Sequence, residues 1–487
     1  MLSFKSILGQ TKKPVFLAVV ITLLFAAVIM YITIHLLHDS YHSSAFDLGV
    51  FAQELKNTLQ GQILYSSAIG GSQFAPHFSP VLLLLVPIYW LFPHVQTLLV
   101  VQALLLAFGG YMIYVLAREY KYSHRASLIL EGLYFINPLL WGVALFDFHE
   151  VAFAIPALLL MFLGLKKKDW VFFGIGLLIA LASKEDVVIV IGVFGAVLMI
   201  ADYWKNKRVE KTSVIVFFAA ILAYGIGIVV SHLASQGESP RMLTYLTSRY
   251  AYVGEPLSQA IPLVTTTIFS TGSLFLIIAY LAPFAFLPIL SPKCCIPALV
   301  VLLEGILSTN DNQHTMLMQY TAAAIPFLFV AFKEVLPKVM ANKDIQSLIQ
   351  KTKNRVVNYS LVFLVIISLA VISEGRIQKA SLPNAHDDAI NQIIALIPDN
   401  ATVTASNAIF SHLVSRTDVF LDAQEGTKMQ TSAGIVKSDW GFPDKNTEYV
   451  ILDTENISMM APDIILLKNR YTQIKILDGV ELYRLNA

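Results

Sequence analysis

The segment ALFDFHEVAF, residues 144–153, places three ionisable side chains within four positions between apolar residues. They are Asp147, His149 and Glu150. Such a set could do chemistry, because a carboxylate can accept the proton of an attacking hydroxyl group in a transition state. Carboxylate and imidazole groups can also hold a divalent metal ion, namely Mg, Mn or Zn. The competing interpretation is a polar cluster that ends a helix, but three ionisable groups between phenylalanines exceed what a helix end requires.

Further ionisable residues lie near the ends of apolar segments, where they could join this set. They are Asp47, His77, Lys184, Glu185, Asp186, Arg249 and His314. Each also has a structural interpretation: Asp47 could cap a helix, His77 could cap a turn, and Lys184 could form an ion pair at a helix end. A charge at the centre of a membrane helix costs about 2.5–3.5 kcal/mol unless it is paired or functional. One shared cavity therefore explains these residues more simply than separate accidents.

The composition indicates which class of protein positions these residues. Of 487 residues, 56% are hydrophobic and only 14% are charged, and the mean hydropathy is +0.66. Soluble domains contain about 25% charged residues, so the chain is predicted to be a polytopic membrane protein. Its net charge of +1 gives no basic field that would attract nucleic acid, which is not expected as a partner.

Apolar segments and basic loops together predict the topology. Lys5, Lys12 and Lys13 precede the first apolar span and place the N-terminus in the cytoplasm, because cytoplasmic loops are enriched in Lys and Arg. The apolar segment 79–94 is shorter than the ~20 residues that a spanning helix needs, so we interpret it as re-entrant. All basic loops then face the cytoplasm. About eleven spans result, at 14–37, 95–117, 126–146, 151–165, 170–183, 187–203, 212–233, 262–290, 296–308, 316–335 and 357–373.

This topology places the candidate residues together on the outer side of the membrane, which favours one outer site. A transporter or lipid flippase would instead need polar groups near the bilayer midplane that are reached alternately from both faces. We keep that function as the alternative. A scaffold that only displays a soluble domain would not need the charged clusters at all.

The tail after residue 373 has a different pattern. HDDAINQIIALIPDN predicts an amphipathic helix, and ATVTAS, DVFL and EYVILDT predict short strands. YTQIKILDGVELYRLNA predicts a hairpin that turns at Asp-Gly. We therefore expect a transmembrane domain in residues 1–373 and a small extracytoplasmic α/β domain in residues 374–487.

Four motifs, in this order, closely resemble the membrane-protein family described as domain of unknown function 2079: FDLGVFAQELKNTLQGQILYSS, HFSPVLLLLVPIYWLFP, FDFHEVAFAIP and SKEDV. Members of that family look like distant relatives of the GT-C glycosyltransferases, whose donors are polyprenyl-phosphate sugars. The resemblance covers roughly residues 15–335 and continues more weakly near the C-terminus. It implies a GT-C-like helical membrane fold.

The resemblance also implies roles for individual residues. In GT-C enzymes an acidic residue of the first outer loop acts as a base or positions a metal ion, and this role falls on Asp47. Asp147 and Glu150 match a later acidic cluster, with His149 as a metal or phosphate contact. These four residues are the predicted ligands if a metal is bound. The predicted substrate and phosphate contacts are His77, His149, Lys184, Glu185, Asp186, Arg249 and His314.

The sequence departs from that superfamily in one respect. Asp47 stands alone where an adjacent acidic pair is common, and Glu54 follows only two helical turns later. The need for a metal therefore stays open. We predict an integral protein of the cytoplasmic membrane that transfers a sugar from a polyprenyl-phosphate-linked donor to an unknown acceptor at the outer face. Its expected partners are membrane lipids, this donor and the acceptor.

Overall fold

The structure is a computed structural model, and it describes most of the chain. The residues outside the description are 1–3, 44, 237–241, 244–248, 352–361, 363–364, 367, 370–374, 417–418, 422–427, 432–433, 438–446, 455–469 and 487. The longer helices are α1 (Phe4–Met30), α4 (Gln96–Glu119), α9 (Glu185–Asn206), α10 (Lys211–Ala234), α14 (Pro292–Leu307) and α15 (Ala324–Met340). The shorter ones are α2 (Val50–Leu59), α3 (Val86–Leu91), α5 (His124–Phe135), α6 (Pro138–Leu145), α7 (Ala154–Lys167), α8 (Trp170–Leu181), α12 (Leu257–Ile268), α13 (Thr271–Leu281) and α16 (Lys343–Lys351).

Four of these helices are long and apolar enough to cross a membrane, and counting two bent helix pairs raises the number to six among the described residues. The four are α1 with its π-helical extension Tyr31–His38, α4, α9 and α10. The bent pairs are α5 with α6, at 51°, and α12 with α13, at 49°. The chain is thus a mostly helical membrane protein, as its composition predicts.

The first ten predicted spans all overlap helical residues, but three of them are not single straight helices. One is 126–146, which forms the bent pair α5 and α6. The segment 316–335 is predicted as one helix, whereas α15 begins only at Ala324, after an irregular stretch that contains a 3-10 turn. The segment 262–290 is bent before Ser270, whose side chain caps α13 by accepting a bond from the backbone of Ser273 at 3.1 Å. The span 357–373 lies largely outside the described residues, and only four to six of the described helices or helix pairs are long and apolar enough to cross a membrane. The total of eleven spans therefore remains a prediction.

The apolar segment 79–94 forms a 3-10 turn, Pro80–Leu85, that continues into α3. Together these twelve residues form a helix roughly 18–24 Å long at the rise of either helix type, which is shorter than the ~30 Å hydrocarbon core of a bilayer. The piece is too short to cross a membrane on its own, and its re-entrant path remains a prediction.

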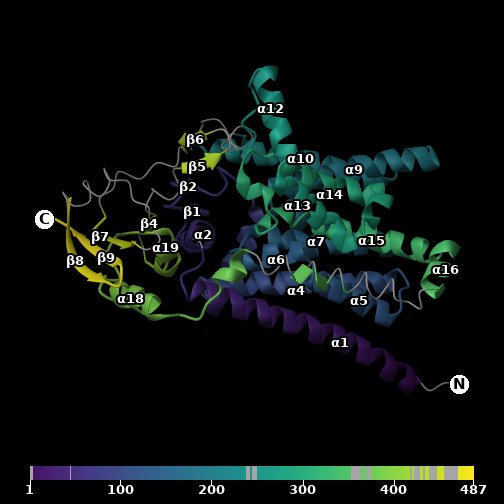
Figure 1. The fold of residues 1–487 in the computed structure, drawn as a ribbon, viewed down its shortest axis with the longest axis horizontal. Coiled ribbons are helices and arrows are strands. Elements are labelled where there is room, and N and C mark those ends of the chain that lie inside the picture. The colour runs from purple at the N-terminus through teal and green to yellow at the C-terminus, as the bar shows by residue number, and fades with distance from the viewer. Residues whose placement is uncertain are drawn as a thin grey trace.

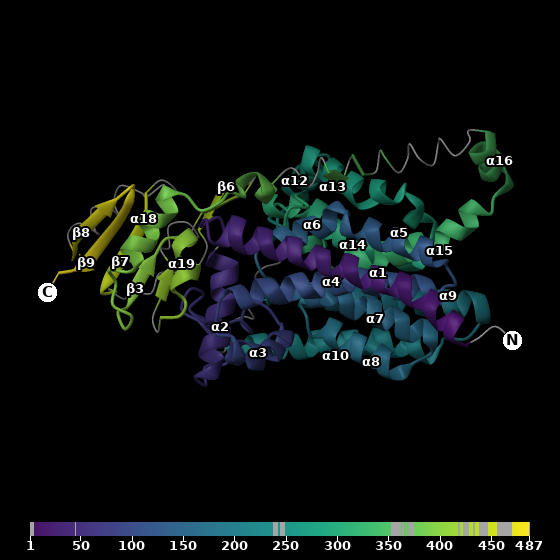
Figure 2. The ribbon, with the colours of Figure 1, turned by 90° about the horizontal axis from the view of Figure 1, so that it is seen from below.

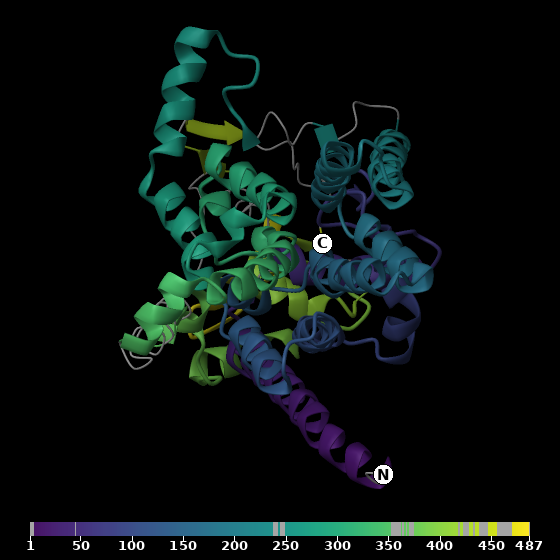
Figure 3. The same cartoon turned by 90° about the vertical axis from the view of Figure 1, so that its right-hand side faces the viewer.

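The helices form an elongated bundle, with the C-terminal sheet beyond one end (Figures 1 and 2). Seen from the other end, α1 lies at the margin of the bundle (Figure 3). Neighbouring helices pack closely, as α7 and α8 do where a Cβ on Gly164 would lie 2.2 Å from the backbone nitrogen of Phe173. Such close approach through small residues is typical of membrane helices, which gain no hydrophobic energy from association in lipid.

The C-terminal part contains a five-stranded mixed sheet with the strand order β4-β3-β7-β9-β8. The strands are β3 (Val403–Ala405), β4 (Val419–Leu421), β7 (Tyr449–Asp453), β8 (Tyr471–Leu477) and β9 (Val480–Leu485), and two helices accompany them, α18 (Ala385–Ile394) and α19 (Asn407–Leu413). The predicted strands and the terminal hairpin are confirmed. A separate two-stranded sheet pairs β5 (Lys428–Thr431) with β6 (Gly434–Lys437), and another pairs β1 (Tyr65–Ser66) with β2 (Gly71–Ser72).

This C-terminal part packs directly on the segment that carries Asp47. A Cβ on Gly49 would lie 2.5 Å from Cδ1 of Phe410 in α19, so only glycine fits this close approach. One residue of α2 extends the contact, because the Gln53 amide donates to the backbone carbonyl of Val419 in β4 at 3.2 Å. The turn around Asp47 is therefore held between the membrane helices and the C-terminal sheet.

Candidate active site

The FDFHE segment forms the connection between α6 and α7. The helix α6 ends at Leu145, and a 3-10 turn at Glu150–Phe153 leads into α7. The buried side chain of Gln102 in α4 holds the connection, since its amide nitrogen donates to the carbonyl of Phe146 at 3.0 Å and its amide oxygen accepts the backbone N–H of His149 at 2.9 Å. One amide thus pairs backbone groups that the end of α6 leaves without helical partners.

We expect Gln102→Leu to lower the free energy of unfolding by about 1–3 kcal/mol, because it leaves buried backbone groups of this connection without partners. Thermal unfolding of the purified protein in detergent measures the loss, and Gln392→Leu at an exposed position of α18 is the matched control. Equal melting temperatures for both variants would show that the amide does not hold the connection.

Asp47 and His149 form the first pair of the site. Asp47 lies in the π-helical turn Ala45–Gly49, and its Oδ1 is 3.3 Å from Nε2 of His149. The His149 side chain is 4% exposed and that of Asp47 is 25% exposed, so Asp47 is the member that a substrate can reach. Burial lowers the pKa of His149, but the charge of Asp47 and its hydrogen bond to the ring outweigh burial and leave this pKa raised.

The other ring nitrogen of His149, Nδ1, faces the backbone carbonyl of Asp147 at 3.1 Å. An imidazolium ion therefore finds an acceptor at each nitrogen, which fixes the orientation of the ring toward Asp47. The side chain of Asp147 is itself buried, at 3% exposure. The structure thus brings Asp47 and His149 together, while Asp147 contributes its backbone to their arrangement.

The raised pKa of His149 makes this pair pH-dependent. Its stabilisation is complete below the pKa of an unfolded histidine, ~6.5, and is lost as the pH rises through the higher folded value. We expect His149→Gln to lower the melting temperature most at about pH 6 and progressively less toward about pH 9. His35→Gln, which alters a solvent-exposed pair with Asp39, is the control and should cost little at either pH. A loss that grows with pH would contradict the pairing.

Glu150 and Lys184 form a second, buried pair. Nζ of Lys184 is 3.0 Å from Oε1 of Glu150, and the hydroxyl of Ser79 donates to the same oxygen at 3.3 Å. The Glu150 side chain is fully buried and that of Lys184 is 7% exposed. Burial raises the pKa of Glu150, but the charges of Lys184 and then of His149 lower it by more than burial raises it. The pKa of Glu150 is therefore below its ordinary value. Burial likewise lowers the pKa of Lys184 while Glu150 raises it above the ordinary value, so both groups carry charge.

Two further pairs involve residues at the start of α9. Nδ1 of His77 is 2.6 Å from Oε1 of Glu185, whose other oxygen accepts the backbone N–H of Phe78 at 3.1 Å. Asp186 lies 3.8 Å from the Arg249 guanidinium. The predicted residues of the first outer loop, the FDFHE segment and the SKED segment thus gather as four ion pairs at one end of the helices.

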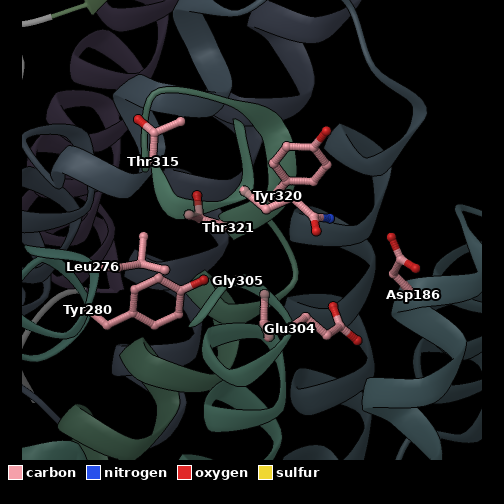
Figure 4. A pocket seen from close by; sticks show the side chains of 10 residues that line it. Asp186, Leu276, Tyr280, Glu304, Gly305, Thr315, Tyr320 and Thr321 are labelled. Carbon is pink, nitrogen blue, oxygen red and sulfur yellow. The ribbon is translucent and has the colours of Figure 1, made fainter. Parts of the chain in front are cut away.

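A small pocket adjoins these pairs, and Asp186 is one of its lining residues. Figure 4 shows Glu304 and Asp186 with their carboxyl groups on the same side of it. The rest of the lining is formed by Leu276, Tyr280, Val301, Gly305, Gln313, Thr315, Tyr320 and Thr321. The Arg249 guanidinium lies 5.9 Å from the centre of the Tyr320 ring, which connects the pocket to the charged pairs. Carboxylates, hydroxyls and an amide suit a molecule that carries several hydroxyl groups.

His314 is the predicted residue whose side chain turns elsewhere. Its Nε2 faces the backbone carbonyl of Ser308 at 2.5 Å, and its Nδ1 faces the Ser270 hydroxyl at 3.3 Å. Its neighbours Gln313 and Thr315 line the pocket, but the His314 ring serves contacts between loops.

The predicted metal ligands do not gather into one set. Across the described part of the chain, no three His, Cys, Asp or Glu side chains come close enough to hold a metal ion. Lys184 neutralises Glu150, while Asp47 faces Nε2 of His149 at 3.3 Å. The arrangement suits proton transfer and charge stabilisation by the protein's own side chains.

Several contributing residues escape prediction from the sequence. Gln102 and Glu304 carried a usable signal, since each is a polar side chain in a predicted span. Ser79 and Tyr320 carried none, because serine and tyrosine are ordinary at span ends.

Glu54 of α2 is fully buried, and its oxygens accept no hydrogen bond from the described residues. Burial, followed by the charge of Glu150, raises the pKa of Glu54 well above its ordinary value.

Comparison with known proteins gives a family and a fold. The sequence model of the family described as Predicted membrane protein (DUF2079) matches residues 37–482. The crystal structure of ArnT from Cupriavidus metallidurans bound to undecaprenyl phosphate is similar, with a TM-score of 0.55 and 13% identity, over 96% of this chain and 97% of that chain. The crystal structure of ArnT from Cupriavidus metallidurans in the apo state is similar with a TM-score of 0.51 and 11% identity, over 96% of this chain and 97% of that chain. ArnT has the GT-C glycosyltransferase fold, so this chain shares that fold. No curated protein matches the sequence.

Proposed function

The chain belongs to the DUF2079 family of predicted membrane proteins, and from this premise we propose that it is a GT-C glycosyltransferase. It transfers a sugar from a polyprenyl-phosphate-linked donor to an acceptor hydroxyl at the outer face of the membrane. The observation that carries the proposal is the partly exposed Asp47 carboxylate, which the buried His149 orients beside further charged pairs. ArnT, which shares the fold, was crystallised with undecaprenyl phosphate, and this supports a lipid phosphate as part of the donor.

The reaction needs a base and positive charge, and both are available near Asp47. Asp47 accepts the proton of the acceptor hydroxyl as its oxygen attacks the anomeric carbon of the sugar. The bond from that carbon to the phosphate oxygen breaks, and the polyprenyl phosphate leaves with the electron pair. Lys184 and Arg249 provide positive charge for the phosphate. The products are the glycosylated acceptor and polyprenyl phosphate.

We propose that the predicted contacts His77, Glu185 and Asp186 position the pocket beside Asp47. His77 and Glu185 hold the start of α9, and with it Asp186, which lines the pocket next to the charged pairs. The polar lining of that pocket suits hydroxyl groups of the sugar or the acceptor.

The orientation of the chain is part of the same proposal. The membrane domain comprises residues 1–373, with the N-terminus in the cytoplasm, and the sheet in residues 374–487 lies outside. This orientation is supported by the ionisable pairs, which gather at the end of the helices next to the sheet, whereas a transporter would need them at the bilayer midplane. Its test is protease treatment from the outer side of the sealed cytoplasmic membrane. We expect the protease to cleave the C-terminal part, and protection of that part would contradict the orientation.

The proposed reaction is tested by donor consumption. The purified protein is reconstituted in lipid and incubated with undecaprenyl-phosphate-linked sugars and a membrane extract as the source of acceptors, and undecaprenyl phosphate is measured by mass spectrometry. We expect release of undecaprenyl phosphate from at least one donor. Movement of the intact donor between the leaflets without any release would instead support a flippase.

A further inference from the structure

A second group of charges lies at the opposite end of the helices. We define the lysine cluster as Lys166, Lys293, Lys333 and Glu334 around the ring of Tyr120. Tyr120 follows the last residue of α4, whereas Gln102 near the start of the same helix holds the candidate active site. Eighteen residues of helix separate the two, which is roughly 27 Å at 1.5 Å per residue and close to the ~30 Å thickness of a bilayer core. The cluster therefore lies at the other membrane interface.

Two lysines of the cluster share one aromatic ring. Nζ of Lys333 is 2.8 Å from the centroid of the Tyr120 ring, and Nζ of Lys166 is 4.2 Å from the same centroid. The hydroxyl of Tyr122 donates to the backbone carbonyl of Lys333 at 2.6 Å and fixes this part of α15. An aromatic ring attracts cations, but it carries no net charge and cannot neutralise them.

The charges of this cluster do not balance. Lys293 pairs with Glu334 at 3.0 Å, and the adjoining Lys167 pairs with Glu119 at 3.5 Å. Lys333 is 4% exposed, and its ammonium group donates no hydrogen bond to any residue that the structure describes. A buried ammonium group without an acceptor is costly, and the second ammonium on the same ring adds repulsion. An anion bound between the two would relieve both costs.

The surroundings favour a lipid as the source of that anion. Trp170, next to the lysine-rich end of α7, is 57% exposed, and Tyr203 and Trp204 at the end of α9 are 55% and 76% exposed. Exposed Trp and Tyr side chains at helix ends are typical of a membrane interface, where lipid headgroups lie. Basic pockets between membrane helices are known to bind the phosphates of anionic lipids. We propose that the lysine cluster binds the phosphate group of an anionic membrane lipid in the leaflet opposite the active site.

The proposal is tested by counting bound lipids. The full-length protein is reconstituted in nanodiscs of phosphatidylcholine with phosphatidylglycerol, and native mass spectrometry counts the phosphatidylglycerol molecules that remain bound. We expect Lys333→Met and Lys166→Met each to reduce retention about fivefold, the factor expected for one lysine near an anionic phosphate. Lys205→Met, at an exposed position on the same side, should retain as much as the wild type.

Folding and the chemical source of the phosphate are controlled separately. Lys333→Met replaces a buried ammonium with an apolar chain of similar volume, so its melting temperature in pure phosphatidylcholine should equal or exceed that of the wild type. Equal retention of phosphatidylglycerol by all variants, or none by the wild type, would overturn the proposal. A further result would also overturn it: the wild type retains no phosphatidylglycerol, but inorganic phosphate stabilises it in pure phosphatidylcholine, and Lys333→Met abolishes this stabilisation. The ligand would then be a free phosphate. None of these outcomes depends on sugar transfer.

Discussion

Asp47→Asn is expected to reduce kcat for sugar transfer by about 10²–10⁴-fold, because the amide cannot accept the proton of the acceptor hydroxyl. The substitution keeps the size of the side chain and its place beside His149, so the protein should remain folded. The rate of undecaprenyl phosphate release from the donor measures the effect. Asp39→Asn, which alters an exposed carboxylate of the same outer loop, is the matched control and should retain normal activity.

The comparison of KM with kcat separates a base from a binding group. Loss of a base lowers kcat with little change in KM, whereas loss of a substrate contact raises KM. A folded Asp47→Asn protein with normal kcat would remove Asp47 from the reaction. Asp186, a partly exposed carboxylate that lines the pocket, then becomes the next residue to examine, as its asparagine variant.

Lys184→Met is expected to lower the free energy of unfolding by about 3–5 kcal/mol, because it leaves the fully buried Glu150 charged and unpaired. The double variant Lys184→Met with Glu150→Leu removes both charges and should recover most of the lost stability. The attraction within a buried ion pair does little more than offset the cost of removing both charges from water. Thermal unfolding in detergent measures both proteins.

The exposed pair of Lys167 with Glu119 is the control for this substitution. Its side chains are 39% and 35% exposed, so Lys167→Met should change the free energy of unfolding by less than about 1 kcal/mol. If Lys184→Met and Lys167→Met have the same stability, Glu150 is not held as a buried anion. If the double variant is no more stable than the single one, the loss comes from packing around Lys184 instead.

The sequence predicts most helices because a membrane span requires a long apolar run with few alternatives. It also predicts β3 and β7, although both are buried on every residue and lack alternation, because most of their residues are β-branched or apolar and turn residues lie beside them. The bend between α12 and α13 is harder to predict, since it comes from the cap that Ser270 forms in an apolar run without proline at that point.

The members of the site are predictable from charge in apolar surroundings, but their partners are not. Asp47 finds His149, and Glu150 finds Lys184, through contacts between segments that are distant in the sequence. Burial distinguishes their roles. The Glu150 side chain is not exposed to solvent and forms a structural ion pair, whereas the Asp47 side chain is 25% exposed and can contact a substrate. The sequence marks all of these charges alike, and only the packing of the helices distinguishes them.

The position of a bound lipid phosphate tests the account most directly. An electron microscopy structure of the full-length protein with added undecaprenyl phosphate would locate it. We expect the phosphate within hydrogen-bond distance, about 3 Å, of Lys184 or Arg249, with the Asp47 carboxylate facing the same cavity. A phosphate found only at the lysine cluster around Tyr120, with the site beside Asp47 empty, would contradict the proposed glycosyltransferase function.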